Sequence, residues 1–148
     1  MAEGNKLVPI VNKQVANWTV LYMKLHNFHW YVKGSNFFAL HAKFEEMYNE
    51  AGVHIDELAE RILALGGSPI ATLKEALEVA SVGEAEGNED ANQMVQSLAD
   101  DFAILISEFN EGIDVAANMG DDTTGDMLIA IHQSLEKNNW MFKAYLGK

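Results

Sequence analysis

Cysteine is absent from all 148 residues of the chain. Its absence excludes disulfide bonds, cysteine-ligated zinc and iron–sulfur clusters, and it is compatible with a reducing cytosol. Apolar residues never approach the run of about 18 that a membrane-spanning helix needs, so no membrane partner is expected. The first residues also lack a basic segment followed by a long apolar one, which argues against a signal peptide. We therefore expect a cytoplasmic protein.

Basic residues are scarce, since 10 Lys and Arg face 22 Asp and Glu and leave a net charge of -12. A chain this acidic repels nucleic acid unless it carries a separate basic patch, and it attracts cations. An acidic surface also serves solubility, so charge alone does not identify a ligand. The length favours one domain with a sizeable core, which we place at 1–148 with a short flexible arm at 1–8.

Strand alternation, internal repeats and low-complexity segments are also missing. Apolar residues instead recur at intervals of three and four, as on helices. The predicted helices cover about 9–32, 36–65, 72–82, 91–118, and from the break at 120–124 to 145. The short helix over 72–82 has a capping box, Thr72 followed by Glu75. It lies in the long connection between the second and third long helices. The pattern predicts an all-α, ferritin-like four-helix bundle with a short helix in this crossover.

Metal-ligand side chains gather on one face of the second long helix. On a wheel of about 100° per residue with His41 at zero, Glu45 falls near 40°, Asp56 near 60° and Glu60 near 100°. Along the helix axis, however, His41 and Asp56 are separated by roughly 22 Å at 1.5 Å per residue. One copy of the helix therefore cannot bring both pairs to one metal ion.

An antiparallel crossing of two copies of this helix removes the difficulty. A two-fold axis between residues 50 and 51 pairs His41 with the partner's Glu60, and Glu45 with the partner's Asp56. A self-complementary contact of this kind creates two identical sites in each dimer. Assembly is then a condition for metal binding.

His29, at the end of the preceding helix, supplies a second imidazole to the His41 end. Each site then has two imidazoles and three carboxylates, which suit Fe(II), Mn(II) or Zn(II) and, after oxidation, Fe(III). Two small residues near the two-fold axis, Ala51 and Gly52, are expected to let the helices approach closely.

The carboxylates of the candidate metal site also fit roles that involve no metal, or have a neighbour that could replace them. Asp56 and Glu60 would suit a solvated face that pairs with Arg61. Glu46 stands beside Glu45 and is an alternative ligand.

The other histidines and the tryptophans are interpreted mainly as structural. His26, His54 and His132 have no obvious metal partner, and Trp18, Trp30 and Trp140 are assigned to the core. Trp30 adjoins His29, so we also consider it a redox neighbour that quenches radicals.

A bundle that binds two irons within one chain typically uses Glu-x-x-His on two helices. No acidic residue stands three positions before any of the five histidines, which disfavours that arrangement.

Several segments resemble one known family. LHNFHWYVKGSNFFALHAKFEEMY and the later DELAERILALGGSP resemble the Dps-like miniferritins, the DNA-binding proteins from starved cells. GDDTTGDMLIA and WMFKAYLGK resemble the same family, especially its members from Gram-positive bacteria. The similarity spans nearly the whole chain.

This resemblance implies a hollow homododecamer that oxidises Fe(II), preferably with hydrogen peroxide rather than oxygen, and stores ferric mineral. Such a protein protects the cell from oxidative damage. The implied metal ligands are His29, His41 and Glu45 of one subunit with Asp56 and Glu60 of its two-fold mate. All of these except Glu45 are also implied as catalytic. The family often has Asp at the position of Glu45, which leaves open whether Glu45 binds iron directly or through water.

The resemblance also implies acidic three-fold pores that admit iron, and Asp122 and Asp126 match the pore positions. Asp121 and Asp122 would alternatively serve as helix caps. The preceding AANMG segment lacks a further acid that some relatives carry, so a less acidic pore is expected.

DNA binding is the main rival function. Some family members hold DNA through a Lys-rich tail, and such a protein would associate with the nucleoid and do little iron chemistry. Here the arm before the first helix contains only Lys6, and the C-terminus reads YLGK. Tight DNA binding is therefore not expected. A purely structural bundle without metal is a second rival.

Overall fold

A computed structural model describes residues 5–148, which form five helices and no strand. The helices are α1 (Leu7–Tyr31), α2 (Phe37–Ala64), α3 (Leu73–Val79), α4 (Ala91–Met119) and α5 (Asp122–Tyr145). Each lies within a few residues of its predicted range. The all-α architecture and the short helix in the crossover are therefore confirmed.

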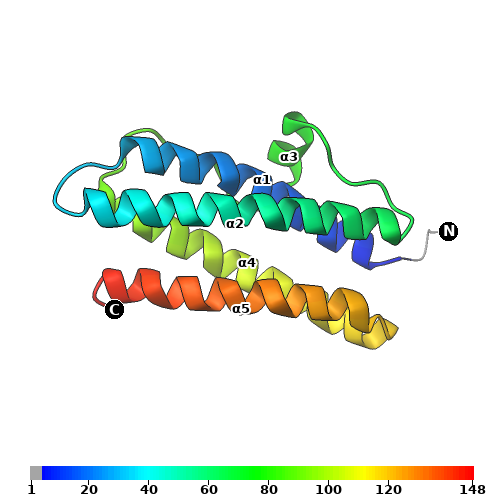
Figure 1. Cartoon of the computed structure of the whole chain (residues 1–148). Helices are drawn as coiled ribbons and strands as arrows, with labels where there is room; N and C mark the ends of the chain where they lie inside the picture. Colours follow the sequence, from blue (N-terminus) through cyan, green and yellow to red (C-terminus); the bar gives the residue numbers. More distant parts are fainter. Residues whose placement is uncertain (1–4) are drawn as a thin grey trace.

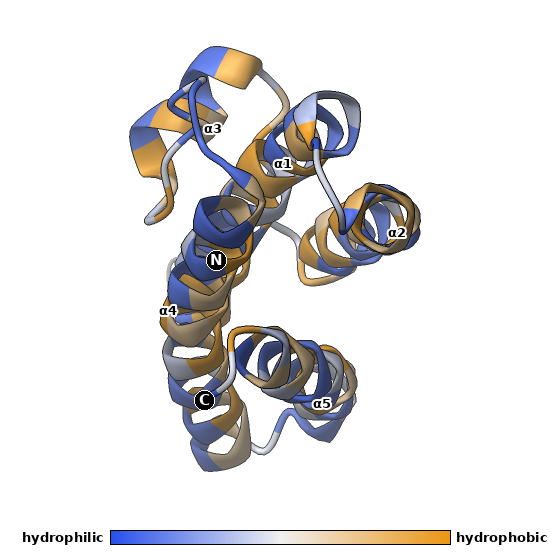
Figure 2. Ribbon diagram, turned by 90° about the vertical axis from the view of Figure 1, so that its left-hand side faces the viewer, coloured by the Kyte–Doolittle hydropathy of each residue, from blue (hydrophilic) through white to orange (hydrophobic). Residues whose placement is uncertain are grey.

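The four long helices pack in two pairs, α1 with α2 and α4 with α5, and α1 also contacts α4. Figure 1 shows these helices lying nearly side by side, with the crossover carrying α3 over α1. The end-on view of Figure 2 places α3 outside the four-helix bundle, beside α1. None of the helices in residues 5–148 combines the length and apolar character that crossing a bilayer requires.

The first helix begins earlier than predicted. Leu7 is already helical and fully buried, and its amide donates to the side chain of Asn5 over 3.0 Å. The predicted flexible arm at 1–8 is therefore wrong at its C-terminal end, because burial of Leu7 stabilises another half turn of helix. The rest of that arm, residues 1–4, lies outside the described residues.

Two glycines are explained by their surroundings. Gly34 begins the turn that leads into α2, with φ at 100°, a conformation that favours glycine. Gly112 lies inside α4, where a Cβ atom would stand 3.1 Å from side-chain atoms of both Ile10 and Leu128. The glycine that weakens the helical pattern of α4 thus permits close packing against α1 and α5.

Polar side chains of α1 hold the crossover in place. They bind its backbone at three successive levels: Asn12 Oδ1 accepts from the Ile70 amide (2.8 Å), Asn17 Oδ1 accepts from the Ser81 amide (2.7 Å), and Lys24 Nζ donates to the Gly83 carbonyl (3.0 Å). These contacts satisfy backbone groups that would otherwise be left without partners where the chain leaves regular structure. They explain why an apolar helix keeps polar residues on a buried face.

Lys24 also forms a buried ion pair with Asp101 of α4, with 2.7 Å between Nζ and Oδ2. Burial raises the pKa of Asp101, although the charge and hydrogen bond of Lys24 act to lower it. The pair therefore links α1, α4 and the crossover at one point inside the protein.

We expect Lys24→Met to lower the free energy of unfolding by about 3–5 kcal/mol, because it leaves a buried carboxylate without its cation. Adding Asp101→Leu should restore most of that loss, since the double variant buries no charge. Urea unfolding of both variants checks this. The exposed Lys13→Met is the matched control, with an expected change within about 0.5 kcal/mol. A single variant as stable as this control would contradict the role of the pair.

A second polar cluster joins the end of α2 to the start of α5. Asp121 caps α5, accepting from the Thr124 amide (3.0 Å) and from the Thr124 hydroxyl (2.6 Å). Arg61 of α2 donates to the Thr124 hydroxyl (2.9 Å) and lies 3.4 Å from Asp121. Burial acts to raise the pKa of Asp121, but these hydrogen bonds and the Arg61 charge outweigh it and lower the pKa. Of the two acids considered as helix caps, Asp121 is therefore the cap and Asp122 is the first residue of the helix.

Asp121→Ala should cost about 1 kcal/mol at pH 7, because the α5 cap is lost. Asp121→Asn should cost less, because Asn also caps well. A lowered pKa in the folded state means that the carboxylate stabilises above its unfolded pKa of about 3.9 and loses this effect as the pH falls through the folded pKa. The gap between wild type and Asp121→Asn should therefore close in acid.

Thermal unfolding at neutral and acidic pH measures this gap. Asp114→Asn, which removes an exposed acid from α4 and leaves the α5 cap intact, is the control. A constant gap at all pH values would show that the charge of Asp121 does not contribute.

Candidate metal centre

The His29 and His41 side chains lie against each other across the turn between α1 and α2. Their rings stack with centroids 3.7 Å apart and an angle of 11°. Each Nδ1 lies 2.7 Å from the backbone carbonyl oxygen of the other histidine. A carbonyl only accepts, so in the neutral rings each Nδ1 carries the proton and each Nε2 keeps a free lone pair. The backbone thereby fixes the tautomer that a metal ligand needs.

Glu45 is the carboxylate beside this pair. Its Oε1 lies 3.9 Å from His29 Nε2, and its side chain is 53% exposed. The neighbouring Glu46 is instead engaged by Lys43 at 3.1 Å. The structure therefore places Glu45, rather than the alternative Glu46, next to the imidazoles.

Asp56 and Glu60 lie in the second half of α2, and both are exposed. Arg61, their suggested partner in a solvated face, binds Asp121 and Thr124 instead. No ion pair involving Asp56 or Glu60 occurs within residues 5–148. Neither acid therefore has an ion-pair partner in the part of its own chain that the structure describes.

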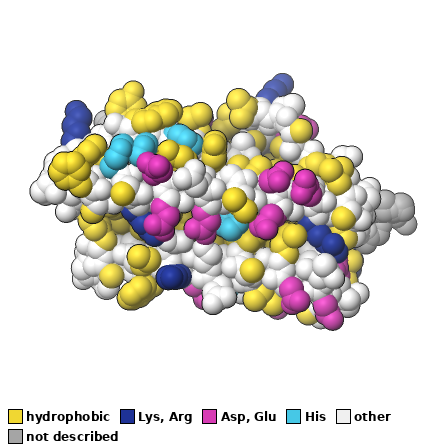
Figure 3. Space-filling view, viewed as in Figure 1, with side chains coloured by type: hydrophobic (Ala, Val, Ile, Leu, Met, Phe, Trp, Pro, Cys, Tyr) yellow, Lys and Arg dark blue, Asp and Glu magenta, His cyan; other side chains and the backbone are white. Residues whose placement is uncertain are grey.

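The two halves of the candidate site stay apart in one chain. Across the described residues, no three His, Asp or Glu side chains come close enough to hold a metal ion. In Figure 3 a group of histidines lies near one end of α2, and acidic side chains continue along the same face of the molecule. A single subunit therefore does not bring the two halves of the candidate site together.

Tyr48 is a neighbour of the histidine pair that the sequence pattern did not single out. Its ring stands edge-on to His29, with centroids 5.3 Å apart, and stacks on His26 at 3.7 Å. Burial raises the pKa of Tyr48, and the charges of Glu45 and Tyr22 add to this effect. Tyr48 follows His41 by seven residues, or two helical turns, so the two side chains share one face of α2. This spacing could have identified Tyr48 from the sequence.

The tryptophans differ in their surroundings. Trp18 is a core residue, 3% exposed, whereas Trp30 and Trp140 are 62% and 65% exposed. The assignment of all three to the core is therefore wrong for two of them. Trp30 contacts the ring of His26 at 5.4 Å.

The predicted pore residues Asp122 and Asp126 lie in the first turns of α5 with exposed side chains. They follow directly after the Asp121 cap, so the Arg61 cluster fixes the helix that carries them. Both carboxylates are free to face solvent or another subunit.

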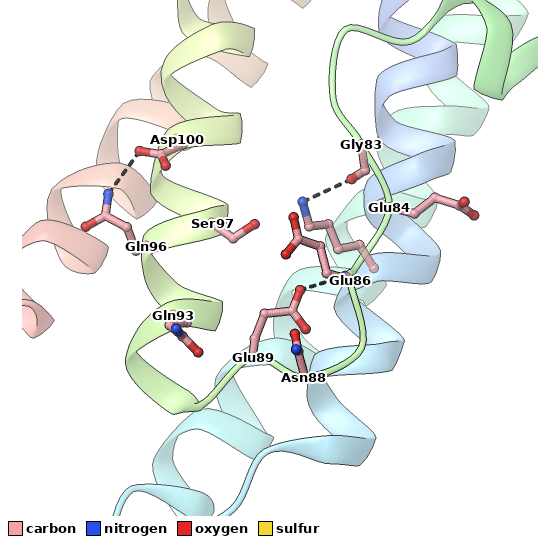
Figure 4. Close-up of a pocket in the computed structure, with 10 residues that line it drawn as sticks. Gly83, Glu84, Glu86, Asn88, Glu89, Gln93, Gln96, Ser97 and Asp100 are labelled. Atoms are coloured by element: carbon pink, nitrogen blue, oxygen red, sulfur yellow. Dashed lines mark hydrogen bonds between the residues drawn. The ribbon is translucent and has the colours of Figure 1, made fainter.

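A cavity of about 480 Å³ lies elsewhere, between the crossover and the start of α4. Figure 4 shows acidic side chains around it, including Glu84, Glu86 and Glu89. Glu89 accepts hydrogen bonds from the amides of Glu86 and Gly87, so it shapes the loop. This cavity contains none of the predicted site residues.

Comparison with known proteins agrees with the fold. Residues 10–148 match the ferritin-like domain family. The chain is 66% identical to General stress protein 20U of Bacillus subtilis, over 97% of this chain and 99% of that protein. It is 50% identical to DNA protection during starvation protein 2 of Bacillus anthracis, over 98% and 99% of the two chains.

Solved structures agree as well. The crystal structure of Dps from Staphylococcus aureus superposes with a TM-score of 0.95 at 55% identity, covering 97% of this chain and 96% of that one. The structure of zinc-soaked Dps from Listeria innocua gives a TM-score of 0.93 at 48% identity, with 97% of both chains covered. Identity at this level over whole chains shows common descent as well as a common fold, and this chain belongs to the Dps family of ferritin-like proteins.

Proposed function

We propose that this protein oxidises Fe(II), preferably with hydrogen peroxide, at sites shared between two subunits. Iron is the substrate, and the ferric product is stored as mineral inside a hollow homododecamer. The observation that carries the proposal is the pair of half-sites along α2, the first of which also includes His29 from the end of α1. One half has imidazoles with preset lone pairs, the other has carboxylates without ion-pair partners, and roughly 22 Å of helix separates them.

The face of α2 between the half-sites supports a second copy as the missing partner. Val53 is exposed there, as are Tyr22 and Met23 on the adjoining α1. Gly52 shares the face of the ligands, at about 20° on the wheel. Ala51, expected to face the axis, is fully buried within its own bundle. A Cβ atom added at Gly52 would stand 3.4 Å from the Tyr22 ring of its own chain, so the small size of Gly52 makes room for α1.

The chemistry follows from this ligand set. His29 and His41 offer neutral nitrogen donors, and the partner's Asp56 and the partner's Glu60 supply negative charge that favours Fe(III) over Fe(II). Hydrogen peroxide takes one electron from each of two Fe(II) ions while its O–O bond breaks. Both oxygen atoms leave at the level of water, so no hydroxyl radical is released.

Glu45 is the third proposed iron ligand from the subunit that supplies the two histidines. Its side chain lies within 3.9 Å of His29 Nε2 and is partly exposed, so a small rotation brings it to a bound ion. Fe(II) would arrive through acidic pores lined by Asp122 and Asp126, drawn by the negative field of the protein. A relative, Dps from Listeria innocua, has been studied after soaking with zinc, which is in keeping with a divalent-metal site in this family.

Subunit mixing tests the shared site directly. His29→Ala with His41→Ala, and separately Asp56→Asn with Glu60→Gln, should each abolish peroxide-driven iron oxidation. Co-expression of the two double variants should restore activity to about a quarter of wild type, because random pairing joins intact histidines to intact acids in about a quarter of the sites. Absorbance of the ferric product is the readout.

The matched control for the acid variant is Glu46→Gln with Glu57→Gln, which changes the same charge on the same helix and should leave the rate unchanged. A mixture as inactive as both parents would contradict a shared site. A fully active histidine variant would contradict the ligand assignment itself.

DNA protection by direct binding is a second candidate function. The Bacillus anthracis relative is named for DNA protection during starvation, which is the observation in its favour. Against it stands a net charge of -12 with only 10 basic residues in each chain. Proteins bind DNA through cation–phosphate contacts, and few are available here.

We therefore expect no shift of duplex DNA in a gel at moderate salt. A complex that forms at low salt and dissolves as salt rises would instead support direct binding.

A further inference from the structure

His54, which the sequence pattern predicts to be structural, lies one helical turn after Glu50 on α2. Its Nε2 is 3.3 Å from Glu50 Oε1. Charge-assisted N–H···O bonds are shorter, usually about 2.7–2.9 Å. The buried pair of Lys24 and Asp101 has that shorter length, at 2.7 Å. The contact between Glu50 and His54 is therefore long for an ion pair.

The other ring nitrogen of His54 has no hydrogen-bond partner. The residue is only 8% exposed, and within residues 5–148 no donor or acceptor reaches its buried Nδ1. The Trp18 ring lies beside the imidazole instead, with centroids 4.7 Å apart. An N–H group interacts favourably with the electron-rich face of an aromatic ring, whereas a nitrogen lone pair is repelled there. These surroundings favour a proton on Nδ1, which in the neutral ring leaves the lone pair on Nε2.

A lone pair on His54 Nε2 faces a carboxylate oxygen of Glu50. Both atoms are then acceptors, and they need a positive charge between them. Two ligands of a tetrahedral zinc ion, each about 2.1 Å from the metal, stand roughly 3.4 Å apart. The 3.3 Å between Nε2 and Oε1 agrees with that separation. The two side chains are thus spaced as ligands of one metal ion are.

Residues of α5 hold the Glu50 carboxylate in this position. The Ser134 hydroxyl donates to Glu50 Oε1, and Asn138 Nδ2 donates to the Ser134 carbonyl over 3.0 Å. Metal-binding carboxylates are typically oriented by hydrogen bonds of this kind. A second pair with the same spacing, His132 and Glu136, is looser: its closest atoms are 3.6 Å apart, and the Glu136 side chain is 60% exposed. Of the two pairs, only the first is held from a facing helix.

We propose that Glu50 and His54 bind a divalent metal ion of the Zn(II) class, with water completing its coordination. Imidazole with one carboxylate suits Zn(II), and a single negative charge is too small to favour a trivalent ion such as Fe(III). The candidate iron site, with three carboxylates, has the opposite preference. A structural zinc site has four protein ligands, so a site with two stays open to water and exchanges its metal.

This site is independent of the proposed iron chemistry. Both protein ligands belong to one helix, so the site is complete within one subunit and needs no two-fold mate. It also contains none of the candidate iron ligands. Zinc binding here therefore goes beyond the proposed function and does not rest on it.

Anomalous diffraction at the zinc absorption edge tests the site in crystals of the assembled wild-type protein soaked with zinc chloride. We expect a peak between Glu50 and His54 in each subunit. Peaks confined to the candidate iron site or to Asp122 and Asp126 would overturn the proposal. This measurement uses no variant, so its result does not depend on how a substitution affects folding.

Equilibrium dialysis measures zinc binding in solution. His29→Ala with His41→Ala is the background, because it removes the imidazoles of the candidate iron site. In this background, Glu50→Gln should lose one zinc ion per chain, and Ser134→Ala should bind that ion about tenfold more weakly. Glu136→Gln, which removes the carboxylate of the looser pair, is the matched control and should bind zinc as the background does.

The remaining outcomes separate the two proposals. Unchanged zinc binding in folded Glu50→Gln would overturn the site, as would an equal loss in the Glu136→Gln control. Wild-type protein that binds zinc between Glu50 and His54 but oxidises no Fe(II) would overturn the proposed function alone. Wild-type protein that oxidises Fe(II) but holds no zinc there would overturn only this inference.

Discussion

The rigidity and length of α2 are the constraint on which the candidate chemistry depends. The helix is continuous over Phe37–Ala64, or about 42 Å at 1.5 Å per residue. A straight rod of this length cannot fold its two ligand groups together. It can present them at a fixed separation, so that an antiparallel copy meets each group with the complementary one. The proposed metal chemistry is in this way tied to the proposed assembly.

The rest of the subunit holds that rod in place at both ends. Near its start, the reciprocal hydrogen bonds of His29 and His41 join α2 to α1 through the backbone. Near its end, Arg61 joins α2 to the cap of α5. The same residues that fix the bundle therefore also fix the candidate ligands and the helix of the predicted pore. Structural and chemical roles are not separable at these positions.

The side chains around the two histidines are also positioned by the backbone and by helix geometry. A histidine bonded to a carbonyl through Nδ1 needs no further residue to set its tautomer. Glu45 and Tyr48 follow His41 on the same helix, one and two turns later, and both lie beside His29. The start of α2 thus carries a nitrogen donor, a carboxylate and a phenol on one face. Few residues are needed because the helix supplies their geometry.

The sequence alone determined the positions of the helices and the common face of the candidate ligands. Apolar spacing located the helices, and the wheel showed that the ligands share a face, because both depend only on the regular geometry of a helix. Tertiary packing decided the rest: which tryptophans are exposed, that Leu7 is buried, that Arg61 binds Asp121 rather than its neighbours, and that Tyr48 lies between His26 and His29. These are contacts between residues of different helices or turns. They depend on how helices pack, which the period of one helix does not contain.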